Sequence, residues 1–167
     1  EGGAAKTYMV REGLFDDVDA AISWHPATFT SVNEAVSLAN TRIDFTFHGK
    51  AAHAAGAPEL GRSALDAVEL MNIGVNYMRE HMPDAARVHY AYLDAGGIAP
   101  NVVQARATVR QLIRSPSLGG LSSLVERVRA IAEGAAFAET VFNDNPWPMH
   151  YADIPTAVFS QPPLASR

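Results

Sequence analysis

The sequence predicts an α+β fold of the split βαβ type, in which two helices cover one face of a four-stranded antiparallel sheet and a short α/β segment comes first. Strict apolar and polar alternation marks half-exposed strands, and a 3.6-residue apolar period marks two helices. These elements follow one another in the order β, α, β, β, α, β. Many unrelated functions use this fold, so the fold alone names none of them.

The beginning of the chain has a different pattern from the rest. Residues 4–15 carry apolar side chains at roughly helical spacing and predict a short helix. Residues 18–24 form an apolar run typical of a strand that is buried on both faces of a parallel α/β sheet. We expect a domain boundary in the polar stretch near residues 30 to 40.

The middle of the chain contains three alternating runs and one helix. Residues 42–48 alternate strictly and predict a half-exposed strand. Ser63 is a suitable N-cap for a helix that runs to about His81 with one apolar stripe. Residues 87–93 and 102–113 alternate again, which predicts two antiparallel partners for the first strand.

The last part of the fold is a second helix. Its apolar period is clean over residues 121–135, and residues 140–142 are predicted to open a final strand. The remaining residues are rich in proline and show no periodicity. The expected organisation is therefore a partial domain at 1–38, a complete domain at 39–143 and an irregular tail at 144–167.

Composition excludes several classes of protein. The chain has 167 residues, of which 48% are hydrophobic and 19% charged, so it should fold around a core. Its net charge of −5 and the absence of a basic run argue against a nucleic-acid partner. No cysteine is present, so a metal would need His and carboxylate ligands. No apolar run is long enough to cross a membrane, and we expect a soluble, cytoplasmic protein whose sequence, starting at Glu1, is part of a longer one.

Two residues near the start of the chain are candidate metal ligands. His25 ends the predicted buried strand, and ligands bind at the carboxyl ends of strands in α/β sheets. A neutral imidazole there could coordinate a divalent metal, but a core histidine beside Trp24 would look the same. Glu1 precedes a glycine pair and the first helix, as a carboxylate held at a loop-to-helix junction would, although a terminal glutamate often has no role.

Three further candidates lie in or beside loops. His53 has Gly and Ala neighbours that allow close approach of a ligand, although a flexible hairpin connection would have the same composition. Asn101 follows Gly96-Gly97 and could offer its amide to a ligand or cap a turn. Arg114 ends a strand, where its guanidinium could hold a carboxylate or form a surface salt bridge.

Several segments together resemble the M20 metallopeptidase and amidohydrolase family, and most closely its aminobenzoyl-glutamate hydrolase branch. The resemblance covers about residues 1 to 140. The segments are EGGAAK at the start, WHP at 24–26, HGKAAHAAGAPELGRSALDAVE at 48–69, GGIAPNVV at 96–103 and IRSP at 113–116. The resemblance implies a catalytic domain with two zinc or manganese ions, into which a βαββαβ lid and dimerisation domain is inserted.

The resemblance also implies a role for each candidate residue. Glu1 and His25 would be metal ligands, and the general base would precede Glu1. His53 would reach from the lid across a homodimer and stabilise the oxyanion in the active site of the partner. Asn101 and Arg114 would hold the carbonyl and the carboxylate of the substrate.

The sequence departs from the family in ways that limit what this chain can do alone. The early His-x-Asp motif, the bridging Asp, the catalytic Glu and the late metal-binding His of the family are not in these residues, and the match ends near Phe142. We expect the longer protein to cleave the amide bond of a small N-acyl amino acid such as aminobenzoyl-glutamate. The isolated chain is expected to be inactive and to hold metal weakly if at all, since stable sites use at least three protein ligands.

Two other functions stay open at this point. The chain could be a dimerisation module in which the edge strands of two sheets pair without any chemistry. It could also be a small-molecule sensor or an RNA-binding sheet. The RNA interpretation is disfavoured, because such a sheet uses basic charge and exposed aromatics, whereas residues 87–93 carry only two tyrosines, which the alternation places on the same face as Val88.

Overall fold

The computed structural model describes residues 5–24, 26–32, 37–142 and 158–160. The chain divides into two compact units, Glu1–Ala35 and Val36–Arg167. Within the described part of the chain, no helix is both long and apolar enough to span a membrane.

The first unit contains one helix. Helix α1, Ala5–Arg11, confirms the predicted short helix, and Gly13 follows with a φ of 74°. The predicted strand at residues 18–24 is wrong, since these residues form no strand and the side chain of Ile22 is fully exposed. A buried strand of a parallel sheet needs neighbours at its edges and over its faces, and the described residues of this unit supply none.

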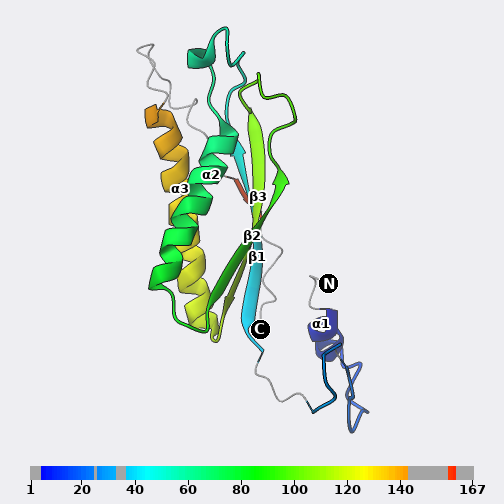
Figure 1. Ribbon diagram of the computed structural model, residues 1–167. Helices are drawn as coiled ribbons and strands as arrows, with labels where there is room; N and C mark the ends of the chain where they lie inside the picture. The colour runs from blue at the N-terminus through cyan, green and yellow to red at the C-terminus, as the bar shows by residue number, and fades with distance from the viewer. Residues whose placement is uncertain (1–4, 25, 33–36, 143–157, 161–167) are drawn as a thin grey trace. The chain divides into compact units, whose positions relative to one another are not determined.

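The second unit is built on three long antiparallel strands, as predicted. They are β1 (Ala39–His48), β2 (Arg87–Asp94) and β3 (Arg106–Ser115), in the order β2-β3-β1. In the register, His48 lies opposite Arg106 at one end of β3, and Asn40 lies opposite Arg114 at the other. Helices α2 and α3 both lie over the same face of this sheet (Figure 1).

The two helices follow from their apolar stripes and caps. Helix α2, Ala64–Met78, starts at the predicted N-cap, because the Ser63 hydroxyl accepts a hydrogen bond of 3.0 Å from the N–H of Asp66. Short 3₁₀ turns precede and follow it at Pro58–Leu60 (η1) and Arg79–His81 (η2). Helix α3, Leu118–Phe142, is longer than predicted.

The extra length of α3 corrects the predicted final strand at residues 140–142, which is wrong. The apolar stripe of the helix continues through Ala135 and Ala136, and the Thr140 hydroxyl donates a hydrogen bond of 2.6 Å to the carbonyl of Phe137 one turn earlier. The three residues that pair with the other edge of β1 are instead β4, Val158–Ser160, within the tail whose composition predicts no regular structure. The four-strand sheet is therefore not found in the form predicted.

The core lies between the helices and one face of the sheet. Strand β1 alternates as predicted, and every second side chain from Ile43 to Phe47 is fully buried. The facing stripe of α2 is also buried, and burial of each large apolar side chain stabilises the fold by about 1.5–3 kcal/mol. The opposite face of the sheet carries polar and charged side chains, some of them partly exposed and some, such as Thr108, buried.

Candidate functional site

The loop that carries His53 is held by backbone hydrogen bonds on both sides. After β1, Gly49 donates to the carbonyl of Ala105, and Lys50 and Arg62 exchange hydrogen bonds of 2.9 and 2.8 Å. His53 itself forms an isolated antiparallel bridge with Val102. This segment is therefore an ordered arm rather than the flexible connection that its composition would also allow.

The imidazole of His53 is oriented by hydrogen bonds to one of its nitrogens. Its Nδ1 accepts hydrogen bonds from the main-chain N–H groups of Ala55 (3.2 Å) and Gly56 (3.0 Å). An Nδ1 that accepts cannot carry the proton in the neutral ring, so the proton is on Nε2. The side chain is exposed, and it therefore presents a fixed N–H donor at the surface.

Small residues allow this geometry. A Cβ added at Gly61 would lie 2.9 Å from the Cβ of Ala52 and 3.0 Å from that of Val103, and one at Gly56 would lie 3.3 Å from the Nδ1 of His53. The loop of His53 thus packs closely against the segment that follows Asn101.

Asn101 is brought next to His53. The N–H of Ala54 donates a hydrogen bond of 2.9 Å to the carbonyl of Asn101, and the N–H of Val103 donates one of 3.0 Å to the carbonyl of Ala52. The two loops therefore run side by side. Asn101 is exposed like His53.

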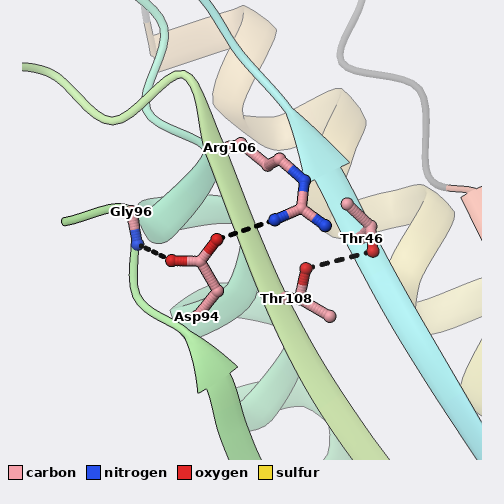
Figure 2. A network of polar contacts seen from close by, with 5 residues as sticks. All are labelled: Thr46, Asp94, Gly96, Arg106 and Thr108. Atoms are coloured by element: carbon pink, nitrogen blue, oxygen red, sulfur yellow. Dashed lines mark hydrogen bonds and ion pairs between the residues drawn. The ribbon is translucent and has the colours of Figure 1, made fainter.

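A polar network holds the start of the Asn101 loop (Figure 2). Asp94 accepts a hydrogen bond of 2.9 Å from the N–H of Gly96 and one of 2.7 Å from the guanidinium of Arg106. Gly96 has a φ of 89°, a conformation that L side chains rarely adopt. The neighbouring Thr46 and Thr108 hydroxyls join β1 to β3 at 3.1 Å.

Arg114 lies at the other end of the sheet. Its neighbours in the register are Asn40 on β1 and Arg87 on β2. His53 follows the end of β1 that lies opposite Arg106, and the stretch of β3 from Arg106 to Arg114 spans about 26 Å. Within one chain, the structure brings His53 and Asn101 together and keeps Arg114 apart from them.

A buried carboxylate lies behind the His53 arm. Glu139 of α3 is only 5% exposed and accepts a hydrogen bond of 2.9 Å from the N–H of Ser63, the residue that caps α2. Burial raises the pKa of the Glu139 carboxyl, against the opposing effect of the Ser63 hydrogen bond. With Asp66 and Glu69 it lines a surface pocket of about 420 Å³.

The two predicted metal ligands, Glu1 and His25, lie outside the described residues. In the part of the chain that is described, no group of three or more His, Asp or Glu side chains could hold a metal ion. These residues on their own do not fit a metal centre.

Three residues beside the candidate side chains are not identified by the sequence patterns: Asp94 and Glu139 near the His53 and Asn101 loops, and Arg87 opposite Arg114. Asp94 stands two residues before a glycine of positive φ, and this turn signature could have identified it. The position of Arg87 opposite Arg114 depends on strand register, and the contact of Glu139 with Ser63 depends on helix packing. Neither strand register nor helix packing can be deduced from the local sequence.

Comparison with known proteins agrees with this fold. The family model described as the M20 peptidase dimerisation domain matches residues 37–140. The B-type subunit of the p-aminobenzoyl-glutamate hydrolase of Escherichia coli (strain K12) is 56% identical over 136 residues, which are 81% of this chain and 28% of that protein. The indole-3-acetyl-aspartic acid hydrolase of Enterobacter agglomerans is 33% identical over 81% of this chain and 32% of its own length.

A solved structure has the same fold. It is the crystal structure of an aminobenzoyl-glutamate utilization protein from Klebsiella pneumoniae, with a TM-score of 0.55 and 26% identity over 74% of this chain and 28% of that one. The chain thus spans about a third or less of the length of these relatives.

Proposed function

The chain belongs to the M20 peptidase dimerisation-domain family, and from this we propose that it is the lid and dimerisation part of a metal-dependent amidohydrolase. Residues 39–143 would be the lid, and residues 1–38 a piece of the catalytic domain. The substrate would be a small N-acyl amino acid such as p-aminobenzoyl-glutamate, the compound in the name of the 56% identical relative. The longer protein, and not this chain alone, would catalyse the reaction.

The two main-chain hydrogen bonds that His53 Nδ1 accepts, which leave Nε2 as the donor of the neutral ring, are the observation that carries this proposal. Amide hydrolysis passes through a tetrahedral intermediate with a negatively charged oxygen, and a preorganised donor stabilises that charge. The two main-chain donors to Nδ1 hold the ring so that it need not reorganise during the reaction. Asn101, on the adjoining loop, would hold the carbonyl of the substrate beside it.

The separation of Arg114 from His53 supports a homodimer. A small substrate cannot span the length of the sheet, so one chain cannot place both side chains on it. An antiparallel copy related by a two-fold axis would bring His53 of one protomer to the Arg114 end of the other. We propose that Arg114 holds the substrate's carboxylate while His53 of the partner subunit acts at the amide.

Strand β2 offers the surface for such a dimer. It is an outer strand of the sheet, eight residues long, and its outer edge is free in the described part of the chain. A free edge is a template for pairing with another strand. Tyr92 and Leu93 are 44% and 49% exposed there, as expected of side chains that a partner covers.

The metal would be held mainly by the rest of the longer protein. Glu1 and His25 are proposed to contribute to a pair of zinc or manganese ions. The described residues do not complete such a site, so the isolated chain is proposed to be inactive. When bound, such metals lower the pKa of a bound water, which is the chemistry that this class of reactions requires.

Substitution of His53 tests the catalytic role. In the full-length protein supplied with zinc or manganese, His53→Ala should lower kcat on p-aminobenzoyl-glutamate by about 100-fold or more, the usual effect of losing an oxyanion donor. His81→Ala removes an exposed histidine elsewhere and should have no such effect. A His53→Ala rate within about threefold of wild type would exclude the role.

Mixing two inactive variants tests the dimer. If His53 acts on the partner's substrate, a mixed dimer of His53→Ala and Arg114→Ala chains contains one intact site and one doubly altered site. Random exchange makes half of the dimers mixed, so about a quarter of wild-type activity should return. Failure to recover activity while mixed dimers are present would place both side chains in the site of the same protomer.

A further inference from the structure

The sheet face that is turned away from α2 and α3 carries a series of arginines, and two of them have an acidic partner. Arg110 makes two hydrogen bonds of 2.6 and 2.7 Å to the carboxylate of Asp44. Arg106 pairs with Asp94 at 2.7 Å. These charges are neutralised within the chain.

Arg87 and Arg114 are different. They lie directly opposite each other in the register of β2 and β3, and both are exposed. Among the described residues, neither guanidinium forms an ion pair with a carboxylate. Two like charges at opposite positions of an antiparallel pair repel each other, so this arrangement favours an anionic ligand.

Arg87 is held in place without being neutralised. Its Nη1 donates a hydrogen bond of 2.6 Å to the carbonyl of Ala86 and another to the carbonyl of Asp84. Main-chain carbonyls orient a guanidinium but leave its charge in place. Within the described residues, its Nε and Nη2 make no hydrogen bond, so these groups can bind a carboxylate, the geometry that the guanidinium fork matches.

We infer that Arg87 is a specificity-determining residue that binds a second carboxylate, so that the enzyme favours N-acyl amino acids with an acidic side chain. This inference rests on the proposed function, in which Arg114 holds the carboxylate common to all N-acyl amino acids. Opposite residues in an antiparallel pair have Cα atoms about 4.5–5.5 Å apart. The two carboxylates of an acyl-glutamate or acyl-aspartate are joined by a short carbon chain and match this spacing.

A second role for Arg87 has to be tested alongside. In the proposed pairing of two β2 strands, the first residue of one strand lies near the last residue of the other, which is Asp94 of the partner subunit. Arg87 could then stabilise the dimer through that contact instead of binding substrate. Asp94 already pairs with Arg106 in its own chain, which favours the substrate.

The experiment compares two substrates that differ in one charge. The full-length protein is assayed with p-aminobenzoyl-glutamate and p-aminobenzoyl-glutamine, as wild type, Arg87→Ala, Arg87→Lys and Arg114→Ala. Arg127→Ala on α3 is the control for loss of one positive charge away from the sheet face. Sedimentation measures the dimer fraction of each variant.

Arg87→Ala should lower kcat/KM for the acyl-glutamate by about 10- to 100-fold, the usual effect of losing a charge-assisted hydrogen bond, and leave the acyl-glutamine within about threefold. Arg87→Lys should be intermediate, because it keeps the charge and loses the fork. Arg114→Ala should lower kcat/KM for both substrates, and Arg127→Ala should lower it for neither.

Three results would overturn the inference. Arg87→Ala could lower kcat/KM equally for both substrates, leave kcat/KM unchanged for both, or dissociate the dimer. Each outcome would assign Arg87 another role. A wild-type protein that hydrolyses neither substrate would instead refute the proposed function, and this inference with it. The two failures are therefore distinguishable.

Discussion

Glu139 and Ser63 are 76 residues apart in the sequence, yet the Glu139 carboxylate accepts a hydrogen bond of 2.9 Å from the Ser63 N–H. This contact joins the end of α3 to the start of α2. The hydroxyl of Ser63 also caps α2. Arg62, the residue before Ser63, exchanges main-chain hydrogen bonds with Lys50 at the base of the His53 arm. A buried acid thus supports the segment on which the proposed oxyanion donor depends.

Replacement of Glu139 by alanine should destabilise the protein. It removes the acceptor and leaves the Ser63 N–H buried without it, which costs about 1–3 kcal/mol. Urea unfolding at neutral pH measures the loss. Glu133→Ala, on the exposed side of α3, is the control and should lose far less.

Replacement of Glu139 by glutamine should act in the opposite direction, and with a pH dependence. Burial raises the folded-state pKa of Glu139 above its ordinary value of 4.5. The stability linked to its proton is therefore complete below that value and is lost as pH rises through the folded pKa. Glutamine keeps an acceptor oxygen without a charge, so Glu139→Gln should exceed wild type in stability at neutral pH and converge with it in acid. A variant less stable than wild type at neutral pH would contradict this.

The Asp44–Arg110 pair should give the reverse pH dependence. The hydrogen bonds and charge of Arg110 lower the pKa of the Asp44 carboxyl, with a smaller contribution from the charge of Arg42 and against the effect of burial. The resulting stability is present above the ordinary pKa of 3.8 and is lost as pH falls through the lowered value. Asp44→Asn should therefore lose stability at neutral pH and little in strong acid. Asp84→Asn is the control, because the Asp84 carboxylate forms no ion pair among the described residues. Urea unfolding of both variants, at neutral pH and in strong acid, measures the free energies of unfolding.

The strands and helices of the second unit could be predicted because their patterns are local. The alternation of β1 and the stripe of α2 are written in consecutive residues, and both elements are confirmed. The strand expected at residues 18–24 depended on neighbours that the described residues do not supply, and the expected strand at Thr140 was overridden by helix packing. Tertiary context decides such segments.

The candidate site could be predicted only residue by residue. The patterns around His53 and Asn101 identify each of them singly, but their proximity comes from hydrogen bonds between two loops. The pairing of Arg87 with Arg114 depends on the register of β2 and β3, which shifts between Tyr92 and Asp94. A single bulge of this kind changes which side chains lie opposite each other, and the periodicity of the sequence does not predict where a bulge occurs.

Loss of Asp94 should impair catalysis more than stability. Its carboxylate fixes Gly96 and Arg106 at the start of the Asn101 loop, near the surface of the sheet. In the full-length protein, Asp94→Ala should lower kcat/KM on p-aminobenzoyl-glutamate by about tenfold, as expected when a positioning hydrogen bond is lost. The unfolding midpoint in urea should change little. An equal effect of Glu133→Ala, on the exposed side of α3, would show that the loss is not specific to this loop.

Alanine substitutions at Gly49 and Gly134 should have opposite effects on the free energy of unfolding. A Cβ at Gly49 would lie 2.1 Å from the carbonyl oxygen of Arg62 and 2.9 Å from the nitrogen of Ala64, which are main-chain atoms that cannot move independently of the fold. Gly49→Ala should therefore cost about 1–3 kcal/mol and displace the base of the His53 arm, so that the activity of the full-length protein also falls.

Gly134 is the matched site for that substitution. It lies inside α3, and apart from its own helix backbone and its two chain neighbours, no atom of the described residues is within 4 Å of its added Cβ. Alanine is favoured over glycine in a helix interior, so Gly134→Ala should raise the free energy of unfolding by about 0.5–1 kcal/mol with unchanged activity. Urea unfolding of both variants measures the difference. If Gly49→Ala were as stable as Gly134→Ala, the close contact between Gly49 and Arg62 would not exist in solution, and the ordered arm that presents His53 would lose its support.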